Sequence, residues 1–261
     1  MVSLEKHGPW AVVTGASAGL GEQFARQLAP LGFKLVLVAR RAGRLEALAA
    51  DLSRLHGAQC RVVALDLASE GADAALDEAT SALEVGLLVN NAGSGYYGRF
   101  LRQDRTRFAA MVRLNCEAVA LLAHRFAGRF AARGRGGMVI VASTAAFQGT
   151  PHMALYGATK GFDLLLGEAL AQEMKGTGVD VVTLCPGATA TEFQAAAGGT
   201  PHAGADAAAV VRDGLRALGR RPVVVPGVAN KLQVVSERLL PRSLVVALGA
   251  RVLRRFDPGG R

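Results

Sequence analysis

Tyr156 and Lys160 are the two residues whose types and spacing most directly suggest chemistry. An interval of four residues on a helix places the phenol and the ammonium on one face. A fixed positive charge there would lower the pKa of the phenol, which would make the tyrosine a usable proton donor. The pair alone is weak evidence, because many helices contain it. It gains value from Ser143, thirteen residues before Tyr156, and from a glycine-rich segment further upstream.

That glycine-rich segment, Thr14 to Gly21, follows the first predicted strand and opens the first predicted helix. Gly15, Gly19 and Gly21 would allow a tight turn, close approach of a pyrophosphate, and contact between helix and strand. The positive end of the helix would then attract the phosphates. We therefore predict a dinucleotide site; the alternative is an ordinary glycine-rich turn.

The end of the second predicted strand indicates which dinucleotide is bound. A domain that binds NAD usually places an acidic residue there to hold the ribose hydroxyls, but the sequence has Ala39 followed by Arg40. A guanidinium would instead complement a 2′-phosphate. We therefore predict NADP(H) in preference to NAD(H), selected by Arg40. Arg41 is either a supporting residue or a solvated surface arginine.

Seven short apolar runs alternate with longer segments of helical period. The runs are almost continuously hydrophobic, which fits strands that are covered on both faces, as in a parallel sheet. The sequence therefore predicts an α/β fold, a Rossmann-type, doubly wound, seven-stranded and mostly parallel sheet flanked by helices, with a C-terminal helical extension. The predicted strands are 10–13, 34–39, 61–65, 87–90, 138–142, 179–184 and 222–225, and the predicted helices are 20–31, 44–56, 70–83, 106–133, 152–175 and 205–218.

The chain has 261 residues and a formal net charge of +9. No linker or repeat interrupts it, so we predict one catalytic domain over 1–227 and a basic helical tail over 228–261. The tail has 7 basic and 2 acidic residues, against 23 and 19 in the rest, so the charge surplus is local and nucleic-acid binding is not expected. Scattered cysteines and histidines predict no disulfides and no metal site. No signal peptide or membrane span is found, so we expect a cytoplasmic protein.

Six motifs follow one another in the order and spacing of a single enzyme family. They are Thr14-Gly-Ala-Ser-Ala-Gly-Leu-Gly21, Asn90-Asn-Ala-Gly93, Asn115, Ser143, Tyr156-Gly-Ala-Thr-Lys160 and Pro186-Gly-Ala-Thr-Ala-Thr191. Together they resemble the classical short-chain dehydrogenase/reductase family over approximately residues 8–227. The tail lies outside the resemblance.

The resemblance implies four catalytic residues. Tyr156 would be the general acid that protonates the carbonyl oxygen as hydride reaches the carbon. Lys160 would hold the nicotinamide ribose and depress the pKa of the tyrosine. Ser143 would donate a hydrogen bond to the developing alkoxide. Asn115 would hold a water that links Lys160 to solvent.

The resemblance also implies the residues that bind the cofactor. Asp66 would lie near the adenine and Thr191 near the carboxamide, whereas Thr189, which stands where the family often has Val or Ile, would contribute through its backbone. Asn91 would be partly structural. The full predicted set is Gly15, Ser17, Gly19, Leu20, Arg40, Asp66, Leu67, Asn91, Ala92, Gly93, Tyr156, Lys160, Pro186, Gly187, Thr189 and Thr191.

The substrate pocket is predicted from residues close to these motifs in the sequence. Tyr96 and Tyr97 follow the Asn-Asn-Ala-Gly loop and would stack on or hydrogen-bond a substrate, the alternative being loop packing. Segment 192–205, which contains three glycines, is predicted to be a flexible lid. The candidate substrate residues are Tyr96, Tyr97, Phe147, His152 and Met153.

These observations predict an enzyme that interconverts a small carbonyl compound and its alcohol with NADP(H). A narrower alternative is a 3-oxoacyl or long-chain acyl reductase with an apolar substrate. A different class, a dinucleotide-binding sensor or scaffold without turnover, is disfavoured by the intact set of Ser143, Tyr156 and Lys160. The resemblance suggests a homodimer or homotetramer that packs through helices 106–133 and 152–175.

The tail has two apolar helical faces separated by Pro241. The first contains Val228, Leu232, Val235 and Leu239, at spacings of four, three and four residues. Arginines and a lysine flank both faces, as expected for helices that lie on the inner, anionic face of a membrane. The tail could equally cover the substrate pocket, or its apolar faces could pack on the domain or on another subunit.

Overall fold

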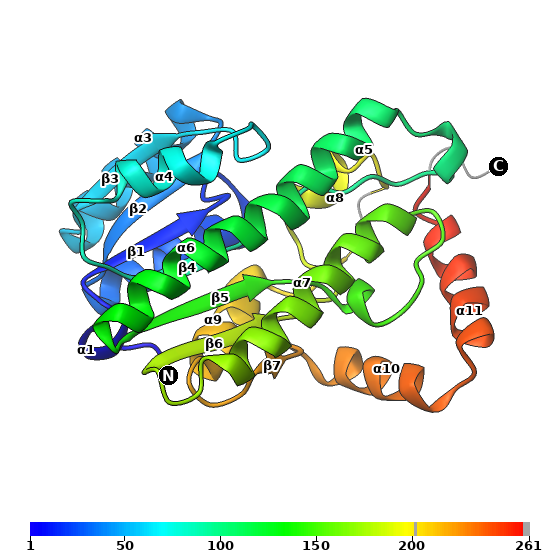
Figure 1. Cartoon of the computed structure of the whole chain (residues 1–261). Helices are drawn as coiled ribbons and strands as arrows, with labels where there is room; N and C mark the ends of the chain where they lie inside the picture. The colour runs from blue at the N-terminus through cyan, green and yellow to red at the C-terminus, as the bar shows by residue number, and fades with distance from the viewer. Residues whose placement is uncertain (201–202, 258–261) are drawn as a thin grey trace.

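The fold is built on a parallel sheet of seven strands in the order β3-β2-β1-β4-β5-β6-β7 (Figure 1). This computed structural model describes residues 1–200 and 203–257. All six strand pairs are parallel, so the predicted doubly wound α/β class is confirmed. The strands are β1 Trp10–Thr14, β2 Lys34–Ala39, β3 Cys60–Ala64, β4 Val85–Asn90, β5 Gly136–Val141, β6 Val179–Leu184 and β7 Val223–Val224.

Helices cover both faces of the sheet and enclose two separate cores. Alternate strand residues explain the division, because Ala11 and Val13 pack in one core and Val12 in the other. The first core lies against α2 (Gly19–Leu28), α3 (Ala42–His56) and α9 (Ala207–Ala217), and the second against α4 (Ala72–Ala79), α6 (Ala118–Arg133) and α7 (Ala154–Glu173).

The single long helix predicted over 106–133 is confirmed in its extent, but it is not α-helical throughout. The chain forms α5 (Arg105–Val112), then a π-helical turn at Arg113–Glu117, and then α6. A π turn widens the helix by one residue and is frequently found at functional sites. Here it places the buried side chain of Asn115 toward the loop after β4.

Several shorter elements also differ from the prediction. Helix α1 (Leu4–His7) was not predicted because four residues are too few to show a period. Helix α4 begins only after Gly71, whose φ of 72° is left-handed, and it ends where the Thr80 hydroxyl donates to Leu76 O. The lid segment contains a short helix, α8 (Phe193–Ala196), while Pro201 and His202 of that segment lie outside the described residues.

The tail forms the two predicted helices, α10 (Val228–Leu239) and α11 (Arg242–Arg254), at one edge of the molecule (Figure 1). The alternative in which the first apolar face packs on the catalytic domain is wrong. The residue of α10 that is buried is Val234, which does not belong to that face. That face is solvent-exposed along its whole length in a single chain, at Val228 (72%), Leu232 (66%), Val235 (55%) and Leu239 (80%). Residues 258–261 of the predicted tail lie outside the described part of the chain.

Candidate active site

A cavity of about 820 Å³ opens at the carboxyl ends of the strands, where ligands bind in open parallel sheets. It brings together residues that are up to 241 positions apart in the chain, from Gly15 to Phe256. The predicted residues that line it are Gly15, Ser17, Gly19, Leu20, Arg40, Asp66, Leu67, Asn91, Ala92, Gly93, Tyr96, Tyr97, Ser143, Met153, Tyr156, Lys160, Pro186, Gly187, Thr189 and Thr191.

The glycine-rich turn fits a pyrophosphate. Gly15 has a left-handed φ of 67°, and a Cβ atom there would lie 2.8 Å from Asn91 Nδ2. A Cβ on Gly21 would lie 2.2 Å from Gly15 O, so helix and strand touch at this glycine. Helix α2 begins at Gly19, and Ala18 before it provides no side-chain acceptor for the first N–H groups. Those N–H groups are suited to phosphate oxygens.

Asn91 is structural in the way that the sequence predicts. Its Nδ2 donates to Thr14 O at 2.8 Å, and its backbone N–H and that of Ala92 donate to Thr14 Oγ1 at 2.9 and 3.0 Å. These bonds fasten the loop after β4 to the end of β1. The backbone of residues 91–93 therefore forms a fixed floor for the cavity.

Two arginines, Arg40 and Arg41, line the cavity directly after β2. Arg40 is 75% exposed in its side chain, and its ion pair with Asp66 is loose, at 3.9 Å. Arg41 is better held, since its Nη2 donates to Ser17 Oγ at 3.0 Å. Arg41 and Arg44 also pair with Glu192 at 3.4 and 2.8 Å. The sequence leaves the role of Arg41 open and gives no sign of its ion pair with Glu192. The two residues are far apart in the chain, and only the fold brings them together.

Tyr156 lies in the first turns of α7, half-buried, with its ring 5.4 Å from that of Phe193. Burial raises the pKa of Tyr156, while the charge of Lys160 and a hydrogen bond with Ser143 lower it, and the net shift is upward. The predicted direction of the lysine effect is therefore confirmed, but burial outweighs it in the protein alone. A Cβ on Gly95 would lie 3.1 Å from the Tyr156 ring and 2.7 Å from that of Phe193, so only glycine lets the loop pass here.

Lys160 and Ser143 both act on this phenol, the first by its charge and the second by a hydrogen bond. Lys160 Nζ donates to Val141 O and to Asp163 Oδ2, both at 2.8 Å. Ser143 follows β5, where its Oγ accepts from Ala145 N–H at 3.1 Å and donates to Pro186 O at 3.3 Å. The serine is thereby fixed with its hydroxyl beside the tyrosine.

Asn115 does not line the cavity. Its amide is fully engaged, donating to Ser94 O at 2.9 Å and to Thr159 Oγ1 at 3.0 Å, and accepting from Ser94 N–H at 2.9 Å. The side chain therefore joins the loop after β4 to α7, one residue from Lys160.

The segment after β6 closes the far wall. Thr189 Oγ1 donates to Gly187 O at 3.0 Å, so its side chain is occupied within the loop. Thr191 reaches the glycine-rich turn, because a Cβ on Gly19 would lie 3.2 Å from its Cβ. A Cβ on Gly187 would lie 2.4 Å from Asn230 Oδ1, which shows how closely the tail is packed there.

Three of the five predicted substrate residues, Tyr96, Tyr97 and Met153, line the cavity. Phe147 and His152 do not. Phe147 packs against a small core below the loop, with Arg238 5.9 Å from its ring centroid. His152 adopts a left-handed φ of 67°, and its Nδ1 is 2.6 Å from Asp257 Oδ2. It holds the tail against the loop before α7.

The tail supplies an apolar wall of the cavity, which supports the reading that it covers the pocket. Val252, Leu253 and Phe256 line the cavity together with Gln233. Thr200 N–H donates to Phe256 O at 3.0 Å, so the tail is also tied to the predicted lid. Phe193 of α8 also lines this side of the cavity, and neither it nor the tail residues were among the predicted substrate residues.

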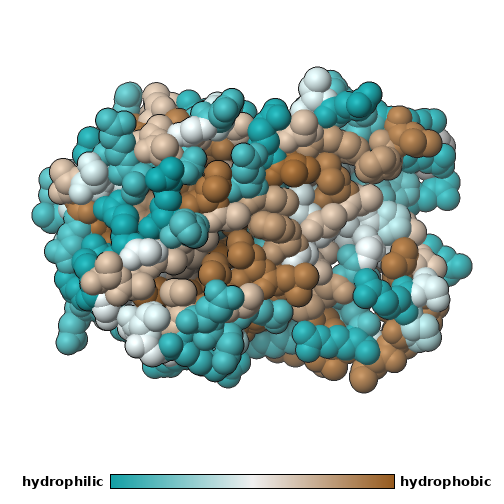
Figure 2. Space-filling view, viewed as in Figure 1, coloured by the Kyte–Doolittle hydropathy of each residue, from teal (hydrophilic) through white to brown (hydrophobic). Residues whose placement is uncertain are grey.

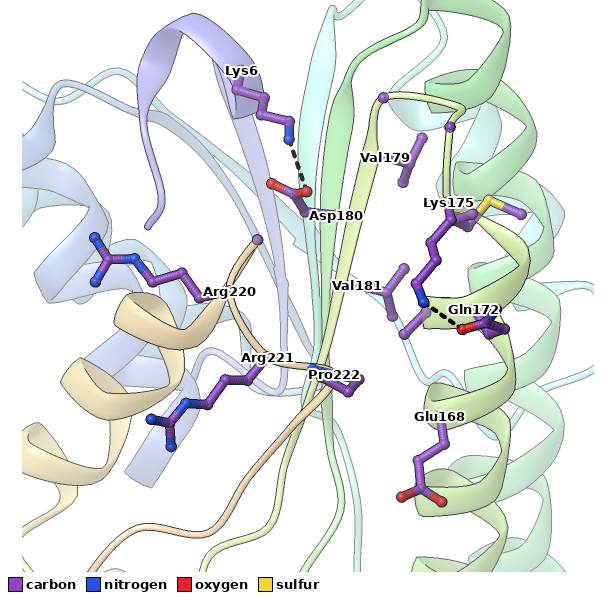
Figure 3. A pocket seen from close by; sticks show the side chains of 15 residues that line it. Lys6, Glu168, Gln172, Lys175, Val179, Asp180, Val181, Arg220, Arg221 and Pro222 are labelled. Carbon is purple, nitrogen blue, oxygen red and sulfur yellow. Dashed lines mark hydrogen bonds and ion pairs between the residues drawn. The ribbon is translucent and has the colours of Figure 1, made fainter.

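A second cavity, of about 650 Å³, lies at the opposite end of β6 (Figure 3). Lys6 pairs with Asp180 at 2.8 Å there, and Arg220 and Arg221 extend away from Glu168 on α7. It contains none of the predicted site residues.

Among the described residues, no three potential metal ligands gather at either cavity, and no described helix could span a membrane.

Comparison with known proteins agrees with this geometry. A family model described as short chain dehydrogenase matches residues 9–201. The 7beta-hydroxysteroid dehydrogenase of Clostridium sardiniense is 31% identical over 247 residues, covering 93% of this chain and 95% of that protein. The very-long-chain 3-oxoacyl-CoA reductase of Podospora anserina is 38% identical over 181 residues, covering 67% of this chain and 53% of that protein.

A solved structure, the short-chain dehydrogenase from Sphingobium yanoikuyae in complex with NADPH, superposes with a TM-score of 0.81 at 32% identity. The superposition covers 89% of this chain and 94% of that one. The chain belongs to the short-chain dehydrogenase/reductase family. It is an oxidoreductase that interconverts a carbonyl compound and its alcohol.

Proposed function

We propose that the chain is an NADP(H)-dependent reductase of a bulky, apolar carbonyl compound, with Tyr156 as its general acid and base. The observation that supports this most is the meeting of Ser143, Tyr156 and Lys160 in one cavity with the glycine-rich turn. When bound, the nicotinamide cofactor supplies or accepts the hydride. A sensor without turnover would have no need of this catalytic set.

Four residues of the protein would each have a separate role in the reaction. Ser143 orients the carbonyl oxygen by a hydrogen bond, and Tyr156 gives its phenolic proton to that oxygen as negative charge develops. The charge of Lys160 lowers the pKa of the phenol, against the larger effect of burial, and the lysine would hold the nicotinamide ribose. Asn115 fixes the loop after β4 against α7, the helix that carries Lys160, and the water chain expected beside it would return a proton from solvent.

The proposed preference for NADPH rests on two arginines and on the lack of an acidic side chain at the end of β2. Arg40 and Arg41 lie at the end of β2, where Ala39 stands in place of an acidic residue. Asp66 and Leu67 would border the adenine, and the other predicted cofactor residues line the rest of the cavity. Guanidinium groups pair well with a 2′-phosphate, and a family neighbour of known structure holds NADPH.

The substrate class follows from the walls of the cavity. Met153, Phe193, Leu253 and Phe256 offer aromatic and aliphatic surface, and Tyr97 and Gln233 are among the polar groups that line the same cavity. We favour a hydroxysteroid-like compound over a long acyl thioester. The reason is coverage: similarity to the hydroxysteroid dehydrogenase extends over 93% of the chain, against 67% for the acyl reductase.

The experiment that tests the function is NADPH oxidation against ketones, aldehydes, steroids and 3-oxoacyl thioesters. Tyr156→Phe should lower kcat by about two to four orders of magnitude while changing NADPH affinity little, because only the transferable proton is lost. Tyr97→Phe makes the same chemical change in the same cavity and should affect KM more than kcat. Near-normal turnover by Tyr156→Phe would exclude this mechanism.

Assembly into a homodimer or homotetramer is part of the proposal. Apolar side chains gather over α6 and α7 in the middle of the face shown in Figure 2. Leu121, Phe162 and Leu165 are 42%, 39% and 67% exposed in the single chain. Burying such a patch is favourable in proportion to its area. A monomer in analytical ultracentrifugation would contradict this assembly.

The tail is proposed to make peripheral contact with the inner, anionic face of a membrane, from an otherwise cytoplasmic protein. The exposed stripe of α10 supports this, because Lys231, Arg238 and Arg242 lie on or next to the same helix. An apolar stripe bordered by cations is typical of helices that lie in the membrane interface.

A further inference from the structure

Asp163 is a buried carboxylate for which the proposed chemistry has so far no use. It lies on α7 one turn after Lys160 and is 0% exposed. Its Oδ2 accepts from Lys160 Nζ at 2.8 Å, and its Oδ1 has no hydrogen-bond partner within the described part of the chain. An incompletely satisfied carboxylate in the interior is costly.

Removing the carboxylate would leave Lys160 in a poor environment. Its side chain is only 6% exposed, and its second partner is a neutral acceptor, Val141 O. The thiols that face this region are uncharged, because burial raises the pKa of Cys116, on the π turn, to about 11 and that of Cys185, after β6, to about 12.

The remaining neighbours bring no negative charge at neutral pH. Thr183, on β6, faces α7 with a buried hydroxyl that also has no partner among the described residues. Asn115, on the π turn, is an uncharged amide, and Tyr156 keeps its proton because its pKa is raised. Glu168, further along α7, is exposed to solvent. Asp163 is therefore the one buried counter-charge of Lys160 in the described chain.

We propose that Asp163 is a positioning residue of the reaction: it keeps Lys160 in the ammonium form and fixes that ammonium below Tyr156. This inference rests on the proposed function. Burial alone would lower the pKa of Lys160, but the charge of Asp163 and its hydrogen bond to the ammonium help to reverse the shift, and the pKa is raised. The lysine is thereby protonated throughout the range in which the tyrosine must act.

The sign of the pH effect follows from these opposing causes. Without Asp163, burial dominates and the pKa of Lys160 falls below its ordinary value. The lysine then loses its charge as the pH rises, and the phenol loses the cation that acidifies it. Activity should therefore decline at a lower pH than in the wild type, while a packing defect would lower activity equally at every pH.

The test is the pH profile of kcat for Asp163→Asn, which keeps the volume and removes the charge. Its matched control is Glu173→Gln, on an exposed turn of the same helix. We expect the alkaline limb of Asp163→Asn to move down by roughly one pH unit or more, with turnover near pH 6.5 changed far less than at pH 9. Glu173→Gln should retain the wild-type profile.

A folded Asp163→Asn with the wild-type pH profile would overturn the inference. If that variant does not fold, the double variant Asp163→Asn with Lys160→Met is purified and its thermal unfolding is measured. A cooperative unfolding transition restored in the double variant supports a stranded buried charge, and a double variant that also fails to fold refutes it. Failure of the proposed function is distinguishable, because the wild type itself would then show no NADPH-dependent turnover.

Discussion

The selection of NADPH by Arg40 can be tested by a substitution whose size the structure sets. A charge-assisted hydrogen bond is worth about 1.5 to 3 kcal/mol. Arg40 is 75% exposed and has only Asp66, at 3.9 Å, to hold it, so solvent screening favours the lower end of that range. Arg40→Ala should therefore weaken NADPH binding by about 10-fold, since about 1.4 kcal/mol corresponds to a factor of ten.

Arg41 should contribute at least as much, because Ser17 already holds its guanidinium at the cavity wall. The assay is isothermal titration with NADPH and with NADH, and the control is Arg54→Ala, an exposed arginine of α3 outside the cavity. Affinity for NADH should be unchanged in Arg40→Ala. Wild-type protein that binds NADH more tightly, or equal losses for both cofactors, would refute the reasoning.

Two further predictions concern stability and surface binding. Burial lowers the pKa of His7, which pairs with Asp180, below its ordinary 6.5. The unfolded state therefore binds more protons than the folded state. Folding stability is lost as the pH falls below about 6.5, the pKa of the unfolded state. Melting temperatures measured from about pH 7 to about pH 5 should fall more steeply for the wild type than for His7→Gln. Replacing Leu232 and Leu239 by Gln should reduce co-sedimentation with anionic vesicles at low salt, whereas Leu55→Gln, another exposed leucine, should not.

The central strands were predictable because each is a short, almost unbroken apolar run. β2 and β6 begin and end at the predicted residues. β7 is shorter than predicted, with only Val223 and Val224 in the ladder, because Pro222 lacks an N–H to donate. The π turn within the long helix was not predictable, since it leaves the apolar pattern of 106–133 almost unchanged.

The cofactor floor was predictable from local sequence, whereas the groups that meet across the cavity were not. Gly15 and Gly19 indicate, from the sequence alone, positions where the backbone needs a left-handed conformation or a close approach. Phe193 beside Tyr156 and Glu192 beside Arg44 are products of the fold. Asp163 is intermediate, because opposite charges three residues apart on one helix are visible in the sequence but their burial is not.

Helical periodicity identified the apolar stripe on α10 but gave no information on what covers it. The two parts of the tail have different surroundings. Phe256 and Leu253 line the cavity, whereas Leu232 and Leu239 are exposed to solvent. One appendage therefore connects the wall of the substrate cavity to an exposed apolar surface. If α10 lies on a membrane, the cavity is held beside the phase in which a bulky apolar substrate concentrates. Loss of vesicle binding should then raise KM for such a substrate in the presence of lipid, and leave KM for a small, water-soluble ketone unchanged.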